Sequence, residues 1–320
     1  MFKPYIDVPV RERVKPELDF MGKRKIALVV SGLLILVSVL SLLLQSLQLG
    51  LDFTSGHAIR IGFAEAVTTQ QAVATLKEQG FTDARVTAFG SDRELRIVLP
   101  SVSLGGAPDS LITGEVIRAV LQQGLNSDAI LLGSDLVSAR ASDDLMEKSG
   151  LGVLVALAIV TAYISLRFQF KFAFAALVAL AHDVILTVGF FSLFQLQFDF
   201  MVLAAIMAVI GYSLNDTIIV ADRIRENFRR LRTLTPEPLI NHSINQTLSR
   251  TLITSGTTLL VVLVILVLGG EAIRGIAIAL AVGIIVGTYS SIYVASSLLV
   301  SLKVTRLDLV PAALESEDQS

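Results

Sequence analysis

The chain contains no cysteine and no tryptophan among its 320 residues, and it has only three histidines. Without cysteine it cannot form a disulfide framework, a thiolate zinc or iron–sulfur site, or a cysteine nucleophile. Charged residues are also few: they make up 17% of the chain, whereas 53% of the residues are hydrophobic. This balance excludes an ordinary soluble domain and predicts a membrane protein, for which we expect neither a metal nor another cofactor.

Six apolar stretches are long enough to cross a bilayer, which takes about 20 helical residues. We place them near residues 26–47, 150–166, 172–194, 200–221, 251–268 and 272–302. The first, within 26–49, exceeds the roughly 7 to 15 apolar residues of a signal peptide core, and no small-residue cleavage pattern follows it. We therefore expect it to remain as a membrane anchor.

Lysine and arginine gather in the short segments on one side of these stretches. They lie within residues 23–25, 167–171, 223–232 and 303–306, whereas the opposite loops 195–199 and 269–271 contain none. Because basic loops stay in the cytoplasm, we expect residues 1–25 and 303–320 inside and residues 50–149 outside. Arg274, near the outer end of the sixth stretch, is the one basic residue that does not fit this distribution. The same rule explains the basic run 223–232 without a nucleic acid partner.

The segment 50–149 is long enough for one small folded domain. Its periodicities predict a strand at 57–63, a helix at 68–79, strands at 84–89 and 94–99, a helix at 109–124 and a strand at 129–139. This βαββαβ order is typical of a ferredoxin-like α+β sandwich, in which two helices cover one sheet face and leave the other available for docking. We take its single histidine, His57, as a polar surface residue.

Ionisable residues inside the apolar stretches are the candidates for function, because each costs about 3 kcal/mol to insert without a partner or a wet path. Helical spacing predicts one polar face on the fourth stretch, formed by Tyr212, Ser213 and Asp216 with Asn215 beside them. It predicts a second on the fifth stretch, formed by Arg250, Thr254, Thr257 and Thr258. Both faces lie toward the cytoplasmic half, so an ion pair between Asp216 and Arg250 is geometrically possible.

This pair has two interpretations. In the first, it is a static salt bridge that pins two helices together. In the second, which the neighbouring hydroxyl and amide groups favour, Asp216 takes up and releases a proton along a hydrated path while Arg250 controls its charge. His182 and Asp183 in the third stretch are adjacent and point about 100° apart on a helix, so at most one of them, preferably Asp183, faces the same path. Asp183 is then either a proton relay or a hydrogen-bonded interior residue without a role in transport.

Two further patterns concern packing and connection. Small residues at four-residue spacing in the sixth stretch let a neighbouring helix of this or another chain approach closely; they are Gly275, Ala279, Gly283 and Gly287.

Residues 222–249 link the fourth and fifth stretches, and apolar residues at helical spacing predict a short interfacial helix at 236–245. This helix is either a passive connector or an element that couples movement of the fifth stretch to a partner.

Four sequence motifs resemble those of one membrane protein family. They are Gly50-Leu51-Asp52-Phe53-Thr54-Ser55-Gly56, Ala181-His182-Asp183-Val184, Ile210-Gly211-Tyr212-Ser213-Leu214-Asn215-Asp216-Thr217 with the nearby Asp222-Arg223-Ile224-Arg225-Glu226-Asn227, and Ser249-Arg250-Thr251. Together they closely resemble the SecF family, whose members pair with SecD in bacterial protein export and belong to the RND superfamily. The likeness covers nearly the whole chain. Ser55 stands where the family usually has one of two glycines after Thr54.

The resemblance implies half of an RND-type bundle in the bacterial inner membrane, six spans beside six of SecD, with a periplasmic ferredoxin-like domain. It implies that the proton-motive force drives late preprotein translocation through SecYEG, with Asp216 carrying the proton, Arg250 as its switching partner and a further intramembrane Asp supplied by SecD. Expected partners are SecD, SecYEG, the preprotein and, as a further candidate, YajC. No nucleophile, metal set or phosphate loop points to an enzyme. Two alternatives stay open: a subunit of an RND-type small-molecule exporter, and a non-conducting membrane scaffold.

Overall fold

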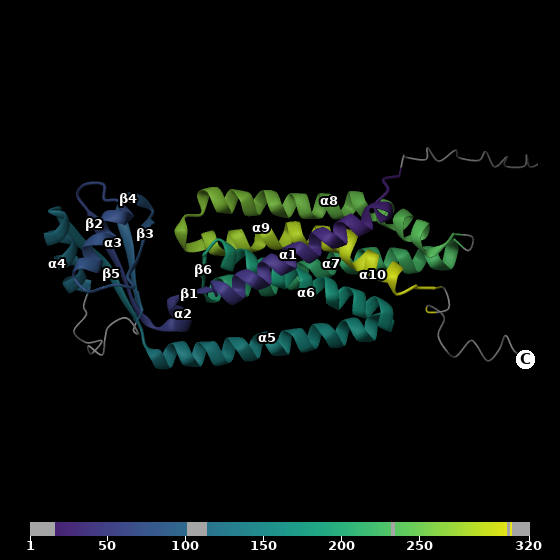
Figure 1. Ribbon diagram of the computed structural model, residues 1–320, viewed down its shortest axis with the longest axis horizontal. Helices are drawn as coiled ribbons and strands as arrows, with labels where there is room; N and C mark the ends of the chain where they lie inside the picture. The colour runs from purple at the N-terminus through teal and green to yellow at the C-terminus, as the bar shows by residue number, and fades with distance from the viewer. Residues whose placement is uncertain (1–16, 101–113, 232–233, 306–307, 309–320) are drawn as a thin grey trace, which may run out of the picture.

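The computed structural model describes residues 17–100, 114–231, 234–305 and 308 of the chain. They form a bundle of long helices and, at one end of it, a small α+β domain inserted between the first and second long helices (Figure 1). The predictions made for residues 1–16, 101–113 and 309–320, including the start of the helix expected at 109–124, lie outside the described residues.

Six helices in the described part are long and apolar enough to cross a membrane, which confirms the prediction of six spans. The first five are α1 (Arg24–Leu44, preceded by the short helix η1, Met21–Lys23), α5 (Ala139–Arg167), α6 (Phe170–Leu193), α7 (Phe200–Arg230) and α8 (Pro236–Leu268). The sixth runs from α9 (Glu271–Ser290) through a π-helical turn, η4 (Ser291–Ala295), into α10 (Ser296–Ser301).

Two helix boundaries differ from the predicted ones. Helix α5 starts at Ala139, capped by the Ser138 hydroxyl that accepts from the Ala141 amide, and so rises directly out of the last strand instead of starting near residue 150. The separate interfacial helix predicted at 236–245 is wrong, because this segment is the beginning of α8. No glycine or proline lies between residues 239 and 255, so nothing interrupts the helix there.

Helices α7 and α9 pack closely in the bundle interior, and small residues allow it. A Cβ atom placed on Gly283 would lie 2.3 Å from Cγ2 of Val209, and one on Gly275 would lie 2.9 Å from Cγ2 of Val202. Ala279 between them is fully buried. The small-residue ladder of the sixth span therefore packs against α7 of the same chain, as its spacing predicted for a neighbouring helix.

The bundle end away from the small domain is closed by polar contacts between distant segments. Arg24 at the start of α1 forms an ion pair with Glu237 at the start of α8. Lys171 at the start of α6 donates a hydrogen bond to the Asp308 carboxylate at 2.8 Å. Burial raises the pKa of Asp308, but the hydrogen bonds from Lys171 and Thr305 outweigh it and hold that pKa below its usual range. These contacts join the ends of α1 and α8, and the start of α6 with the segment that follows α10.

The small domain contains the predicted βαββαβ order. Its elements are β2 (Gly56–Phe63), α3 (Thr69–Glu78), β3 (Arg85–Phe89), β4 (Ser91–Pro100), α4 (Gly114–Leu125) and β5 (Ala129–Val137). The antiparallel sheet has the strand order β3-β4-β2-β5, which is the ferredoxin-like arrangement. Ile59 and Ile97 of the sheet pack with Leu76 of α3 and Leu121 of α4, so both helices cover the same sheet face.

Short elements join this domain to the bundle. Strand β1 (Gln48–Leu49), after α1, pairs in parallel with β6 (Gln197–Phe198), before α7. One helical turn, α2 (Leu51–Thr54), follows β1 and ends at Ser55, whose φ of +56° is a conformation that non-glycine residues rarely adopt. Gly56 has φ +131°, and a Cβ atom there would lie 2.1 Å from the Leu99 carbonyl oxygen, so only glycine fits this position.

The prediction that His57 is a polar surface residue is wrong. Its side chain is buried, with 4% exposed, and Nε2 has no hydrogen-bond partner among the described residues. The reason is that His57 pairs with Leu99 of β4 and lies on the same sheet face as Ile59 and Ile61, which α3 and α4 cover. The sequence did carry a signal, because His57 stands two residues before the apolar Ile59 and side chains two residues apart in a strand share a face.

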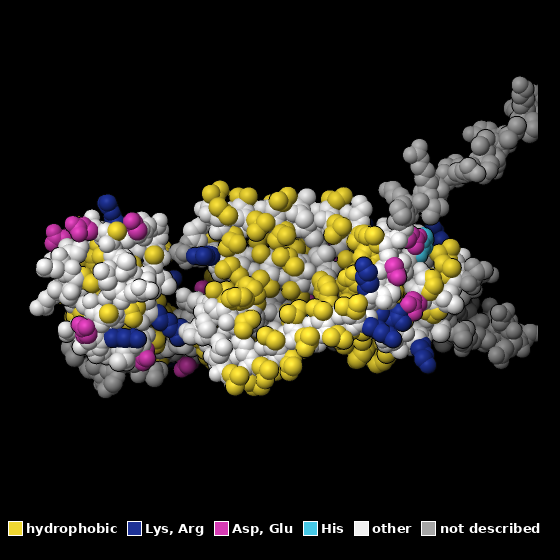
Figure 2. All heavy atoms as spheres, turned by 45° about the horizontal axis from the view of Figure 1, so that its top comes forward, with side chains coloured by type: hydrophobic (Ala, Val, Ile, Leu, Met, Phe, Trp, Pro, Cys, Tyr) yellow, Lys and Arg dark blue, Asp and Glu magenta, His cyan; other side chains and the backbone are white. Residues whose placement is uncertain are grey.

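The outer surface of the bundle is strongly apolar (Figure 2). Helix α5 has only 6% of its most apolar window buried within the chain, and α8 only 17%. Such surfaces suit contact with lipid or with another membrane protein, not with water. The fold is therefore that of a multi-pass membrane protein.

Candidate functional site

The Asp216 carboxylate lies in the interior of the bundle on α7, with 1% of the residue exposed. Its Oδ2 atom accepts a hydrogen bond of 3.1 Å from Ser255 Oγ on α8, and Thr288 Oγ1 on α9 donates to Ser255 at 2.8 Å. No donor among the described residues reaches Asp216 Oδ1. A carboxyl group is thus connected through two hydroxyl groups to two other helices, and one of its two oxygens has no donor among the described residues.

Arg250 does not pair with Asp216 in this structure. No ion pair between them occurs among the described side chains, and Arg250 is exposed on the surface of the chain. Ser255 lies five residues after Arg250, which is about 140° around the helix axis, so the two occupy different faces of α8.

The predicted polar stripe on α8 does not face Asp216 either. Thr254 Oγ1 donates to the carbonyl groups of Arg250 and Thr251 in its own helix. Thr257 and Thr258 also bond to carbonyl groups of α8. Hydroxyl groups turned back onto their own helix are satisfied without any neighbouring helix, which the spacing alone could not reveal.

A second buried carboxylate, Asp183 on α6, is fully inside the chain. Its Oδ2 atom accepts hydrogen bonds from Ser213 of α7 and from Ser290 Oγ of α9, the latter at 2.7 Å. Its Oδ1 atom lies 2.9 Å from Nδ1 of the adjacent His182. His182 and Asp183 are both buried, because α1, α7 and α9 surround α6, but only Asp183 bonds to hydroxyl groups of α7 and α9. That at most one of the two, Asp183, lies on the same polar path as Asp216 stays a prediction.

The His182 ring extends this cluster toward α1. It stacks on the ring of Tyr289, with centroids 6.3 Å apart, and the Tyr289 hydroxyl donates to the Ala27 carbonyl at 2.7 Å. His182 Nε2 is buried and has no hydrogen-bond partner among the described residues. The π-helical turn η4 begins two residues after Tyr289, and such turns occur often at functional sites.

The two other polar residues predicted on α7 lie outside this cluster. The Tyr212 hydroxyl is buried without a described partner, in the apolar contact between α7, α8 and α9. Asn215 is exposed on the outward face of α7. The residues predicted on one face are thus divided: Ser213 and Asp216 point inward and Asn215 points away from the chain.

The structure adds Ser255, Thr288 and Ser290 to the candidate site, and none of them was predicted. A signal was present in the sixth span, where Thr288-Tyr289-Ser290-Ser291 interrupts an apolar helix just as Tyr212 to Asp216 does in the fourth. Ser255 had no comparable signal, because a single serine in a spanning helix usually bonds to its own backbone.

The motif that follows α1 joins three parts of the molecule. The Gly50 amide donates to the Phe198 carbonyl at 2.8 Å, and Thr54 Oγ1 donates to the Gly50 carbonyl at 3.0 Å. Asp52 Oδ2 accepts from the first amide of α7, that of Phe200, at 3.0 Å. The Phe53 ring lies 6.3 Å from the ring of Phe198. Together with Gly56 these residues fix the domain to the start of α7.

Comparison with known proteins places these features in one family. A family model described as "Protein export membrane protein SecD/SecF, C-terminal" matches residues 117–305. The protein translocase subunit SecF of Vibrio alginolyticus is 42% identical over 306 residues, which are 95% of this chain and 96% of that protein. The SecF subunit of Pseudomonas aeruginosa is 39% identical, over 92% of this chain and 94% of its own.

A solved structure shares the fold. The crystal structure of SecDF, a translocon-associated membrane protein from Thermus thermophilus, matches 91% of this chain with a TM-score of 0.79 and 37% sequence identity. The match covers 39% of the SecDF chain. The described fold therefore corresponds to one part of that longer protein.

Proposed function

Because the chain belongs to the SecF family of protein translocase subunits, we propose that it works beside a SecD subunit and couples proton movement across the membrane to protein export. In this proposal the pair uses the proton-motive force to promote late translocation and release of preproteins through SecYEG, with YajC as a further candidate partner. The chain acts without a cofactor and catalyses no covalent step. Its energy comes from the proton gradient, which supplies about 2.3 kcal/mol per charge for each 100 mV.

The observation that carries the proposal is the environment of Asp216. An ionised carboxylate buried in a spanning helix is costly, and here only one of its two oxygens has a hydrogen-bond donor among the described residues. Protonation would relieve that cost. The Ser255 and Thr288 hydroxyl groups can both donate and accept, so they can reorient when Asp216 changes from acceptor to donor.

Arg250 suits the role of a switching partner in this cycle. A permanent structural clasp would hold the guanidinium against the carboxylate, whereas no ion pair joins the two among the described side chains and Asp216 bonds to Ser255 instead. We propose that the pair closes when Asp216 is ionised and opens when it is protonated. Movement of α8 against α7 would then transmit the protonation of Asp216 to the partner subunits as a change in helix position.

The outward face of α7 is suited to contact with the helices of a partner subunit. It carries Ala204, Ala208, Gly211 and Asn215, which are exposed at helical spacing, and nothing lies within 4 Å of the Cβ position of Gly211. Small residues with one amide are typical of helix contacts within membranes, and an amide facing lipid alone would be costly. We propose that SecD packs here and supplies a second intramembrane carboxylate near Asp216.

We place both ends of the chain in the cytoplasm and the small domain in the periplasm of the bacterial inner membrane. The basic segments lie at the bundle end away from the domain, where Arg167, Arg225 and Arg230 occur, in agreement with the rule that positive loops stay inside. The domain would therefore meet the preprotein as it leaves the channel.

The experiment measures preprotein release in inverted membrane vesicles that contain the partner subunits, with and without an imposed proton gradient. With Asp216→Asn we expect release to fall to the level seen without the gradient, and with Arg250→Lys we expect a partial loss. Asp144→Asn, which changes an exposed carboxylate on α5, is the matched control and should keep full stimulation. If the proton gradient still stimulates release in vesicles with correctly assembled Asp216→Asn protein, the proposal of proton coupling through Asp216 is overturned. The chain would then act as a membrane scaffold.

A further inference from the structure

A histidine and a carboxylate are buried next to each other on α6. His182 has 3% of its surface exposed and Asp183 has none, and the contact between Nδ1 and Oδ1 measures 2.9 Å. This contact holds one proton, which is the Nδ1–H of the imidazole when Asp183 is ionised. The other ring nitrogen, Nε2, has no hydrogen-bond partner among the described residues. It is therefore the atom of the pair that is open to a second proton.

With one proton in the contact, the pair has a net negative charge inside the bundle. Ser213 and Ser290 donate to Asp183 Oδ2, but hydroxyl groups carry no charge that could balance the carboxylate. Among the described side chains, the only ion pair that Asp183 forms is the one with His182. An uncompensated charge is costly away from water. A second proton on Nε2 would make the pair neutral.

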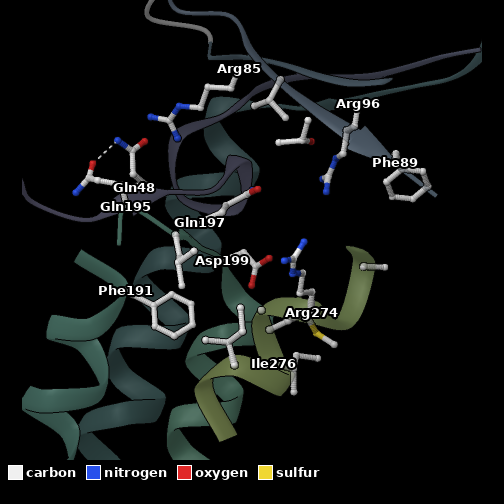
Figure 3. Close-up of a pocket in the computed structure, with 17 residues that line it drawn as sticks. Gln48, Arg85, Phe89, Arg96, Phe191, Gln195, Gln197, Asp199, Arg274 and Ile276 are labelled. Carbon is white, nitrogen blue, oxygen red and sulfur yellow. Dashed lines mark hydrogen bonds between the residues drawn. The ribbon is translucent and has the colours of Figure 1, made fainter. Parts of the chain in front are cut away.

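The helices packed against α6 bring no other cation to this pair. Residues 26–44 of α1 contain no ionisable side chain. The apolar stretches of the other packed helices carry Tyr163 on α5, Tyr212 and Asp216 on α7, Arg274 and Tyr289 on α9, and Tyr293 on η4. The one cation in this set, Arg274, lies about four turns before Ser290 and lines a cavity at the domain end of the bundle (Figure 3).

Asp216 is the second negative group near His182. Ser213 and Asp216 are both buried and lie three residues apart on α7, so their Cβ atoms are about 5–6 Å apart. Because Ser213 donates to Asp183, the two carboxylates lie at the same turn of α7. Arg250 pairs with neither of them among the described side chains. Charges this close in the interior interact strongly, so a proton on His182 would lower the cost of ionising Asp216.

Tyr289 fixes the environment of the imidazole. Its hydroxyl donates to the Ala27 carbonyl at 2.7 Å and accepts from Ser31 Oγ at 3.2 Å, so α1 holds the ring in place. The centroids of the tyrosine and histidine rings are 6.3 Å apart, with an angle of 26° between the ring planes. The face of an aromatic ring is negatively polarised, and it favours a cation over a neutral ring.

We propose that His182 is a second proton-binding residue of the chain, which takes up a proton at Nε2 and compensates the buried charges of Asp183 and Asp216. The imidazolium would allow Asp216 to release its proton before Arg250 reaches it. Proton binding by His182 is argued from the geometry of the pair. Its use in transport rests on the proton coupling proposed above.

The test measures protonation of His182 directly, by solid-state NMR of the full-length protein in liposomes with ¹⁵N-labelled histidine rings. The chain has three histidines, so the signals lost in His182→Gln are those of this residue. We expect a change from imidazole to imidazolium within roughly pH 5 to 8. At the midpoint of that change, Asp216→Asn should lower the protonated fraction about twofold or more, because a compensated charge has been removed. Asp144→Asn, which changes an exposed carboxylate on α5, should leave it unchanged.

A neutral His182 over this whole pH range would overturn the proposal in the wild-type protein, without any variant. An unchanged protonated fraction in Asp216→Asn, with thermal unfolding that shows a folded protein, would overturn the compensation of Asp216. The vesicle assay described above tests proton coupling separately. If His182 titrates as expected while Asp216→Asn keeps its stimulation by the gradient, the proposed function fails and the proton site on His182 stands.

Discussion

Ser55 adopts a backbone conformation that normally requires glycine. The residue ends the turn after α2 with φ +56° and ψ +167°, a combination that is nearly restricted to glycine. Its side chain is buried and its hydroxyl donates to the Thr54 carbonyl at 2.6 Å. Strain of about 1 to 3 kcal/mol is therefore held beside the junction of the domain with the bundle.

Substitution of Ser55 by glycine should stabilise the protein. Removal of the side chain relieves the strain at positive φ, and the lost hydroxyl contact and the greater freedom of the unfolded chain offset part of the gain, so we expect about 1 kcal/mol. The measurement is thermal unfolding in detergent, followed by circular dichroism. Ser149→Gly within α5 is the control and should lower stability by about 0.5–1 kcal/mol. A lower melting temperature for Ser55→Gly would show that the turn is not strained.

The candidate site was predicted in part at this scale. Asp216 and Asp183 could be found because a carboxylate within an apolar run is costly, and that cost does not depend on the fold. The partner of Asp216 could not be found, because the choice between Arg250 and Ser255 depends on the rotation of α8 about its axis. Rotation is set by packing against α7 and α9, which no local pattern encodes.

Among the helices, the contact between α7 and α9 brings functional residues together. Ser213 of α7 lies against Gly287 of α9, with its Cβ 3.0 Å from the Cβ position of that glycine, and both helices donate hydroxyl groups to Asp183. A small change in the separation of the two helices would therefore disturb the hydrogen bonds around the carboxylate.

A leucine at position 283 should separate these helices. The added atoms would overlap with Val209, and overpacking of this kind costs about 1–3 kcal/mol. We expect Gly283→Leu to lower the thermal stability measured in detergent, and the second substitution Val209→Ala to restore part of it. Gly256→Leu on α8, where nothing lies within 4 Å of the Cβ position, is the control. Equal stability of Gly283→Leu and the control would contradict the close packing.

Element types were easier to predict than element ends. The period of the apolar residues gave the six spans and every strand and helix of the small domain in the correct order. The start of α5 was not predicted, because its first turns carry Asp143, Asp144 and Glu147. These residues lower the hydropathy of a segment that is still helical. Hydropathy reports where a helix meets lipid, and not where its hydrogen bonds begin.

For the whole molecule, the main consequence is that the described chain leaves the small-residue face of α7 uncovered. Gly211 lies at the centre of the outward face of α7, one turn from Asn215. Nothing in the described chain covers this position within 4 Å. The proposed SecD contact therefore depends on the absence of a side chain there.

Gly211→Leu should weaken assembly without unfolding the chain. We expect the amount of SecD that co-purifies with the tagged variant to fall several-fold, because a branched side chain prevents close approach of the helices. Gly32→Leu on α1 is the matched control, since its Cβ position is equally open. Recovery of SecD equal to that of the control would place the partner on another face of the bundle.

Helix α5 gives the molecule a lever arm. A single capping residue, Ser138, separates it from strand β5, and its 29 residues run without a break along the bundle (Figure 1). At 1.5 Å per residue the arm is about 43 Å long, so a tilt of about 10° at the domain would sweep its far end through roughly 7 Å. Because α5 is the least embedded of the spans, a tilt of the domain would be carried along it to the far end of the bundle with little resistance from neighbouring helices.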